Sequence, residues 1–260
     1  MSTVTNQPLP FGQLEREKHI QRIFRALHDE PLPGGGLAPE TQWSEGAAAS
    51  HFMCSLETVS QIHVTARPEL QGPQCVPRRI YSITTGSSRS QIFVAVEETS
   101  CVCLQCCGPA RACSLQGFDR RGRQVFHFER PLRVDACCLG CCLMEMRAYT
   151  PQKHLIGTVC QRWSVFTPLL EVCGSEGASA VSVQGSCWPS RCASSQQFQI
   201  VSNIGEKMGT IWKKWPGFNV EHNMDHEHFG LEVPLNMEPH MKLLLLAATF
   251  LLNYMFFEMS

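Results

Sequence analysis

The sequence predicts a mainly β fold of antiparallel strands, a barrel or a sandwich, that ends in one strongly apolar helix. Two hairpin patterns and this helix support the prediction. RRIYSITTGSSRSQIFVAVEE places a Gly-Ser turn between two β-rich runs. ACSLQGFDRRGRQVFHFERPLRV gives a second hairpin, with its turn at residues 119–122 and with Phe126 and Phe128 on one strand face. With 260 residues and 43% hydrophobic composition, the chain can bury a substantial core.

Residues 1–55 are expected to form an appendage to this domain. Within it, FGQLEREKHIQRIFRALHDE carries apolar residues mostly at helical spacing, which predicts a short amphipathic helix. PLPGGGLAPE then ends the helix, because proline lacks the amide donor and glycine has high chain entropy. The compact domain is therefore expected to span residues 56–260, with the apolar helix included.

A weak internal repeat lies inside the predicted β region. IGTVCQRW, residues 156–163, and MGTIWKKW, residues 208–215, share an apolar-Gly-Thr-apolar start and a final tryptophan. Each follows a turn and precedes a loop that contains proline. This pattern indicates two copies of one strand-turn unit, with chance similarity as the alternative.

The helix predicted at residues 243–257, LLLLAATFLLNYMFF, must be surrounded by protein or by lipid, because apolar residues cover all its faces. Its length of about 22 Å falls short of a hydrocarbon core of about 30 Å. The amide of Asn253 would also need partners in lipid. Burial in the β domain is therefore slightly favoured over a membrane span. The residues that mark this membrane or core helix are Leu243, Phe250, Asn253 and Phe257.

Charge and motifs restrict the function classes. A net charge of -1 offers no basic field for nucleic acid, which is therefore not an expected partner. The start, MSTVTNQPLP, shows no secretory signal, so the chain is expected on the cytosolic side, where thiols stay reduced. Neither Gx4GK[ST] nor GxSxG occurs, so we expect neither ATP-driven work nor an enzyme.

The 15 cysteines allow two interpretations. Cys103-x2-Cys106 and Cys138-x2-Cys141 have the spacing of a zinc ribbon, with a predicted hairpin between them. The alternative is S-acylation, since cytosolic thiols beside apolar and basic residues can take several acyl chains near a membrane. The candidate lipidation residues are Cys137, Cys138, Cys141 and Cys142.

The segment MDHEHFGLEVPLNMEPHMK can be aligned with a calcium loop that starts at Asp225 and has Gly230 at the sharp turn. An amide at the twelfth position and an apolar ninth position predict weak affinity, about 10⁻⁴ to 10⁻³ M. The predicted Ca²⁺ ligands are Asp225, Glu227, Phe229, Leu231, Val233 and Asn236.

The same segment also has histidines. His222, His226 and His228 could bind zinc or copper instead of calcium. A solvated polar turn without any ligand is the third interpretation, and the sequence leaves all three open.

Four segments, in this order, resemble the phospholipid scramblases: RPLRVDACCLGCCLMEM, IGTVCQRW, FGLEVPL and the terminal run ending in YMFFE. The similarity extends from about residue 56 to residue 258. It implies a fold similar to that of Tubby proteins, a closed β-barrel around a C-terminal hydrophobic helix. The family helix is also commonly drawn as a membrane span.

The resemblance further implies calcium-responsive movement of phospholipids and plasma-membrane attachment by palmitoylation of the four candidate cysteines, with most of the chain cytosolic. Leu139 and Gly140 replace a family cysteine and a family proline, and enough acceptors remain. Glu227 and Asn236 stand in for aspartates of the family, in keeping with the weak calcium affinity expected. A segment linked with nuclear import in some relatives matches residues 209–217, so a nuclear fraction is an expectation too.

Two functions follow from these patterns. The first is calcium-responsive, ATP-independent, bidirectional movement of phospholipids between leaflets. A single short helix offers no polar groove for headgroups, so this function would require homo-oligomers or local thinning of the bilayer. The second is a palmitoyl-tethered module that binds a lipid or a protein and transports nothing.

Overall fold

The structure, a computed structural model, describes residues 52–67, 79–86, 91–100, 103, 106–107, 110–120, 122–133, 143–164, 167–185, 195–214 and 228–257. The predicted N-terminal helix and the four candidate lipidation cysteines lie outside these residues. The core already includes Phe52, close to the predicted domain boundary at residue 56.

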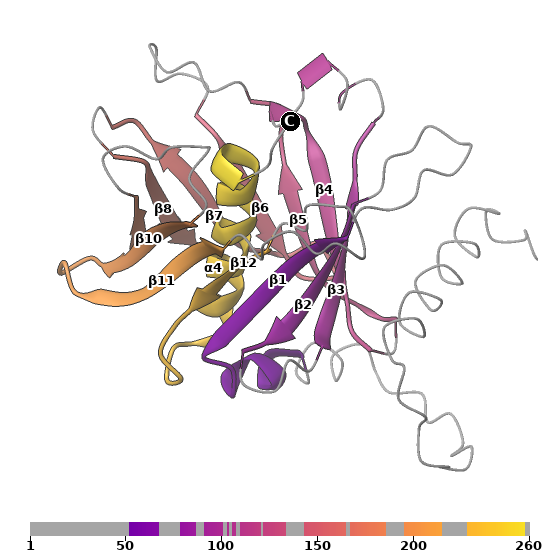
Figure 1. The fold of residues 1–260 in the computed structure, drawn as a ribbon, viewed down its shortest axis with the longest axis horizontal. Coiled ribbons are helices and arrows are strands. Elements are labelled where there is room, and N and C mark those ends of the chain that lie inside the picture. Colours follow the sequence, from indigo (N-terminus) through magenta and orange to yellow (C-terminus); the bar gives the residue numbers. More distant parts are fainter. Residues whose placement is uncertain are drawn as a thin grey trace, which may run out of the picture.

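Twelve antiparallel strands close into a barrel in the order β1-β12-β11-β10-β9-β8-β7-β6-β5-β4-β3-β2 (Figure 1). Apart from the closing pair β1 and β12, each strand pairs with its neighbours in the sequence, so the barrel is an up-and-down meander. This confirms the predicted mainly β fold and its closed antiparallel barrel. The strands are β1 Gln61–Arg67, β2 Arg79–Thr85, β3 Gln91–Glu98, β4 Cys113–Phe118, β5 Gln124–Arg130, β6 Glu145–Tyr149, β7 Leu155–Arg162, β8 Leu169–Gly174, β9 Ser179–Gln184, β10 Ser195–Ser202, β11 Lys207–Lys214 and β12 His228–Glu232.

Both predicted hairpins are present. β2 pairs with β3, and β4 pairs with β5. In the second hairpin the amide of Gly122 donates to the carbonyl of Asp119 over 2.9 Å, with Gly122 at a φ of 76° that favours glycine. Phe126 and Phe128 both face the interior and stack with their ring centroids 4.6 Å apart.

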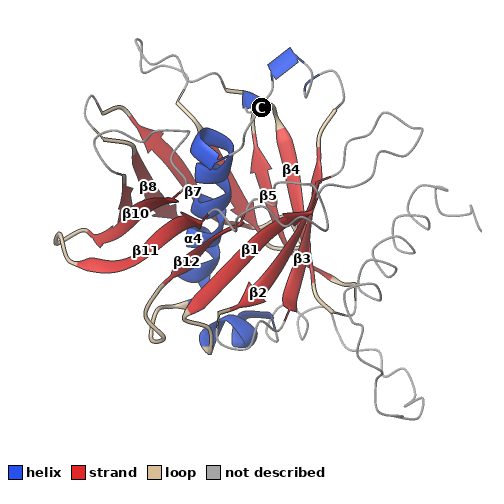
Figure 2. Ribbon diagram, viewed as in Figure 1, coloured by secondary structure: helices blue, strands red, loops and turns tan. Residues whose placement is uncertain are grey.

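The apolar run forms helix α4, Pro239–Leu252, which continues as a π-helical turn, η2, over Asn253–Phe257. α4 runs through the barrel and is enclosed by the strands (Figure 2). Leu243 and Phe250 are fully buried, and so is every residue between them except Leu244, which is 2% exposed. A helix that is apolar on all faces needs such surroundings. The side chain of Phe257 is not among those described.

In the described part of the chain, 239–256 is the one helical segment long and apolar enough to cross a membrane. This is weak support for a span, because a buried core helix meets the same criteria and 78% of this segment is buried. In this structure the helix is the core of the barrel.

The two copies of the internal repeat fall on β7 and β11, and each of these strands follows a tight turn. On β7, only glycine fits at position 157, because β8 and α4 both lie close to its backbone. A Cβ at Gly157 would lie 2.3 Å from the carbonyl oxygen of Cys173 and 2.9 Å from the side chain of Leu244. This copy of the repeat therefore places a glycine where the wall and α4 approach closely.

Strand direction gives the barrel two distinct ends. One end holds the tight turns 150–154, 174–178 and 202–206, the helical residues 52–57 and the start of α4; we call it the turn end. The other end is where β3, β5, β7, β9 and β11 finish and where η2 lies; we call it the loop end. In Figure 1 the loop end is at the top, beside the C-terminus.

Candidate functional site

Three segments that carried functional predictions connect strands at the loop end. Residues 99–112, with Cys103 and Cys106, join β3 to β4, and the chain between β5 and β6 carries the candidate lipidation cysteines. The chain between β11 and β12 carries Asp225 and Glu227. An antiparallel meander sends alternate connections to the same end, so the topology assigns these three connections to the loop end.

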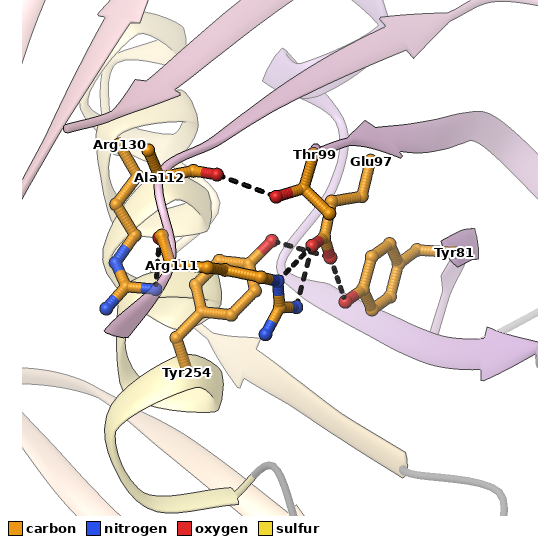
Figure 3. Close-up of polar contacts among 7 residues, drawn as sticks. All are labelled: Tyr81, Glu97, Thr99, Arg111, Ala112, Arg130 and Tyr254. Carbon is orange, nitrogen blue, oxygen red and sulfur yellow. Dashed lines mark hydrogen bonds and ion pairs between the residues drawn. The ribbon is translucent and has the colours of Figure 1, made fainter. Parts of the chain in front are cut away.

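A buried carboxylate lies where these connections meet the end of the internal helix. Glu97, on β3, is 1% exposed, and Figure 3 shows three side chains converging on it. Oε1 accepts from Nε of Arg111 over 2.7 Å and is 2.6 Å from its second nitrogen. Oε2 accepts from the hydroxyls of Tyr81 over 3.0 Å and Tyr254 over 3.1 Å. We call these four residues and Arg130 the Glu97 cluster.

Arg130 completes the Glu97 cluster from β5. Its guanidinium lies 4.9 Å from the centre of the Tyr254 ring, and that of Arg111 lies 5.0 Å from the same centre. Arg130 also donates to the carbonyl oxygen of Arg111 over 3.2 Å. Nearby, the hydroxyl of Thr99 donates to the carbonyl oxygen of Ala112 over 2.8 Å, which joins the strand ends β3 and β4 (Figure 3). Tyr254 is thus held by one carboxylate and two cations.

Two titratable groups beside Glu97, Tyr254 and Cys113, have raised pKa values. Burial raises the pKa of Tyr254 well above its ordinary value, and nearby Cys113 and Glu97 raise it further. Burial, together with the charge of Glu97, raises the pKa of the Cys113 thiol to about 12. A thiol in that state is a poor nucleophile and a poor metal ligand. Cys113 is therefore a packing residue of this site.

The Glu97 cluster is suited to holding the helix end in place. Oε1 of Glu97 has two contacts with Arg111 and Oε2 accepts from two hydroxyls, and these contacts offset the cost of burying the charge. The contacts join η2 to β2, β3 and the chain entering β4. The Glu97 cluster therefore has a structural role, because both carboxylate oxygens of Glu97 are used in contacts within the protein.

Lys242 holds the other end of the helix, at the turn end. It is fully buried, and its ammonium donates to the carbonyl oxygens of Leu56, Glu57 and Val59 over 3.0, 3.0 and 2.9 Å. It also donates to the carbonyl oxygen of Leu235 over 2.9 Å. Burial lowers the pKa of Lys242 from its ordinary value. The internal helix is therefore fixed by buried polar contacts at both ends.

Asn253 directly precedes Tyr254, where α4 passes into η2. Its side-chain amide is fully buried, and neither its oxygen nor its nitrogen has a hydrogen-bond partner in the described part of the chain. The sequence singled out this residue as costly in lipid. The structure places it inside protein.

A cavity of about 530 Å³ opens beside the Glu97 cluster at the loop end. Its lining carries charges of both signs, with Glu98 and Glu129 facing the same space as Arg130 and Arg147. The partly exposed thiol of Cys103 also lies on its wall. Side chains of both charges can bind a ligand that carries a negative and a positive group.

The predicted calcium loop is divided by a strand. Phe229 and Leu231 lie in β12, where they pair with Val64 and Ile62 of β1, and their side chains are buried. Val233 is buried too, and Asn236 is exposed beyond it at the turn end. Asp225 and Glu227 lie outside the described residues. Because β12 runs along the wall from the loop end to the turn end, Asn236 lies at the opposite end of the barrel from the start of β12.

The described residues include two of the four cysteines of the predicted zinc ribbon. Cys103 and Cys106 are free thiols at the loop end. Cys138 and Cys141 belong to the candidate lipidation cysteines, outside the described residues. Within those residues, no three metal-ligating side chains form a group.

Sequence reasoning missed the Glu97 cluster. One signal was available: Tyr254 is a phenol in a mostly apolar run, and Glu97 is an acid in the β-rich run FVAVEE. A polar group in a predicted core position requires a partner. The sequence could indicate that partners exist, but it could not pair residues so far apart.

Comparison with known proteins gives a consistent set of similarities. A family profile described as Scramblase matches residues 80–259. Phospholipid scramblase 1 of Rattus norvegicus is 36% identical over 65% of this chain and 50% of its own length. Phospholipid scramblase 2 of Bos taurus is 34% identical over 65% of this chain and 58% of its own. Phospholipid scramblase family member 5 of Homo sapiens is 33% identical over 65% and 63%, respectively.

The chain spans about half the length of the first of these relatives. No solved structure matches it significantly.

Proposed function

Because the chain belongs to the scramblase family, whose profile matches residues 80–259, we propose that it moves phospholipids between membrane leaflets. The match to this profile is the observation that carries the proposal. Movement runs in both directions and uses no ATP, in keeping with the absence of a Gx4GK[ST] motif from the sequence. The chain is a lipid transporter and has no catalytic residues in this proposal.

The loop end faces the membrane in this proposal. Acylation of Cys137, Cys138, Cys141 and Cys142 would place several chains on the connection between β5 and β6, and two or more chains give stable anchoring. Leu132 and Trp163, which follow β5 and β7, are 53% and 58% exposed at this end. Exposed apolar side chains also occur at the turn end, so the position of the thiols decides the orientation.

The open cavity beside Arg147 suits the first contact with a phospholipid. Phosphate can meet the guanidinium of Arg147, whose side chain is 45% exposed, and an amine headgroup can meet Glu129, which is 48% exposed. The internal helix stays in the barrel. Lipids would therefore cross where the attached barrel, alone or as a homo-oligomer, thins the bilayer.

In this proposal calcium promotes the movement of lipid. Asp225 and Glu227 supply oxygen donors just before β12 and thus on the membrane-facing side. Asn236 lies beyond β12 and would not share their ion. The expected site therefore uses fewer ligands than a full calcium loop, so its affinity stays weak.

The expected location is the plasma membrane, with most of the chain in the cytosol. Palmitoylation supplies the anchor. A nuclear fraction, suggested by Lys213 and Lys214, requires the acyl chains to be absent.

A dithionite assay tests the proposed activity. Purified full-length protein is reconstituted in liposomes that carry fluorescent lipid, and the protected inner-leaflet signal is followed from zero to millimolar calcium. A calcium-dependent loss of protection that Asp225→Ala abolishes is the expected result. An unchanged protected fraction, in vesicles that contain folded protein, overturns the activity, and an equal loss without calcium overturns only the calcium step.

The internal position of α4 favours a second candidate function, a membrane-tethered module that binds lipid or protein without transport. Glu97 and Lys242 fix the two ends of the helix by buried contacts, so the barrel is complete without a membrane. This function predicts binding of vesicles by the acylated protein with no change in the dithionite-protected fraction.

A further inference from the structure

Two histidines meet on the outer wall of the barrel, away from the Glu97 cluster. His63 of β1 and His228 of β12 are both partly exposed, and Nδ1 of His63 lies 3.4 Å from Nε2 of His228. Their rings stack with an interplanar angle of 26°. Neighbours Ile62 and Val64 are fully buried in the barrel, so the alternation of the strand directs His63 outward.

The separation of the two nitrogens is that of two ligands on one metal ion. Zinc binds imidazole nitrogen at about 2.0–2.1 Å in tetrahedral geometry, which places two such nitrogens about 3.3–3.4 Å apart. In the structure the distance is 3.4 Å, reached by side chains of neighbouring strands. We propose that His63 and His228 bind one ion of the Zn²⁺, Ni²⁺ and Cu²⁺ class, with water completing the coordination.

A hydroxyl group orients one of the two ligands. Oγ1 of Thr65 lies 3.2 Å from Nδ1 of His228. When Nε2 of His228 binds a metal, its proton resides on Nδ1, and the hydroxyl of Thr65 then accepts it. Without metal, the same hydroxyl can donate to Nδ1 while the two histidines share a hydrogen bond. Thr65 therefore suits both states, and the change between them moves a proton within a ring without releasing it.

Trp212 packs against both histidines. Its ring centroid lies 5.0 Å from that of His63 and 5.2 Å from that of His228. Gly230 is paired with His63 on one side and Trp212 on the other, and a Cβ there would lie 2.8 Å from the indole. Because Gly230 has no side chain, Trp212 has room to pack against the imidazole rings of both histidines. The indole also provides a fluorescent reporter beside the proposed ion.

The charges around the pair favour a nitrogen-bound ion over calcium. Lys214 of β11 is the register partner of His228 on the neighbouring strand β12, and its ammonium lies 4.9 Å from the centre of the Trp212 ring. Glu232, the acid on the same outer face, already accepts from Gln61 over 3.1 Å. Calcium requires oxygen ligands, whereas imidazole suits zinc, copper and nickel. The site is thus distinct in its chemistry from the predicted calcium ligands, and it does not depend on lipid transport.

Nickel binding tests the site without reference to membranes. Full-length protein is treated with N-ethylmaleimide to remove accessible thiols as ligands and is then titrated with Ni²⁺ alone, by calorimetry and tryptophan fluorescence. We expect His63→Gln and His228→Gln each to weaken binding at least tenfold, and Thr65→Val to weaken it severalfold. Trp212→Phe should keep the affinity and remove most of the fluorescence quenching. His154→Gln, at an exposed turn-end residue, is the matched control and should change neither.

Two results would overturn the proposal. If His63→Gln binds Ni²⁺ like the unchanged protein while His228→Gln does not, the ion belongs to the histidines before β12 and His63 takes no part. If neither variant changes the affinity, the pair binds no metal. Electron paramagnetic resonance of bound Cu²⁺ adds a second readout, because the expected nitrogen coupling from two imidazoles should fall to one in His63→Gln. Circular dichroism of each variant confirms that it is folded.

Discussion

The hydroxyl of Tyr254, near the end of the internal helix, donates to Oε2 of Glu97 on β3 over 3.1 Å. The two residues are 157 positions apart in the sequence. This contact joins the last turn of the helix to the barrel wall, and Tyr81 donates to the same oxygen from β2. The end of the helix is therefore held to the wall by polar contacts that can be removed one at a time.

Tyr254→Phe should lower the free energy of unfolding by about 2 kcal/mol, because it removes a hydrogen bond to a buried charge while keeping the ring. Urea denaturation measures the change. Tyr149→Phe, at a partly exposed tyrosine of β6, is the control and should cost less than about 1 kcal/mol. Equal stability of Tyr254→Phe and the unchanged protein would show that the contact does not hold the helix.

Glu97→Gln should be more damaging, with a loss of about 3–5 kcal/mol, because it leaves the guanidinium of Arg111 buried without its counter-charge. Arg111 is fully buried, so water cannot replace the carboxylate. The double variant Glu97→Gln with Arg111→Met should lose less than the sum of the two single changes. Additive losses in urea denaturation would mean that the two charges are not coupled.

Lys242→Met tests the other end of the helix. The change removes the donor to four carbonyl oxygens, and those of Leu56 and Val59 are buried. Each unsatisfied buried acceptor costs about 1–3 kcal/mol, so we expect a loss of about 3 kcal/mol in the free energy of unfolding. Lys207→Met, at an exposed lysine, should leave the urea midpoint within experimental error. A midpoint for Lys242→Met that matches this control would contradict the role of Lys242.

The pKa of Cys113 predicts an alkaline loss of stability. The folded thiol has a pKa of about 12 against an ordinary value of 9.0, so its contribution is complete below pH 9 and is lost as the pH rises to 12. Over that window the loss reaches about 4 kcal/mol, at 1.36 kcal/mol for each pH unit. Tyr254, whose pKa is also raised, adds to the loss above about pH 10.

Urea midpoints measured between pH 8 and pH 11 check this expectation. Cys113→Ala should show a shallower decline than the unchanged protein, whereas Cys54→Ala, at an exposed thiol, should follow the unchanged protein. Parallel declines in all three proteins would assign the alkaline sensitivity to other groups.

Much of the fold could be predicted from local patterns. The hairpins of β2 with β3 and β4 with β5 followed from alternation and turn residues, and burial of Leu243 and Phe250 followed from a helix too short to span and apolar on all sides. The family resemblance supplied the closure of the barrel, which pairs β1 with β12 across most of the chain. No local pattern contains that pairing.

The candidate sites were harder to predict for the same reason. His228 was singled out with its sequence neighbours His222 and His226, but the structure also places it against His63, 165 residues away. The calcium alignment treated residues 225–236 as one loop, and pairing with β1 made part of it a strand. Proximity in three dimensions follows from strand register, and residue spacing alone does not determine that register.

Membrane extraction tests the central claim, that α4 is barrel core and that acyl chains anchor the protein, most directly. Membranes from cells that express the full chain are treated with neutral hydroxylamine, which cleaves thioesters, and are then washed with alkaline carbonate. A parallel sample carries alanine at Cys137, Cys138, Cys141 and Cys142. The account predicts that the protein is found in the soluble fraction in both samples. Protein released by hydroxylamine, collected before the carbonate wash, should show a cooperative unfolding transition. Retention of both samples in the carbonate-washed membranes would contradict it and would show that the C-terminal helix spans the bilayer.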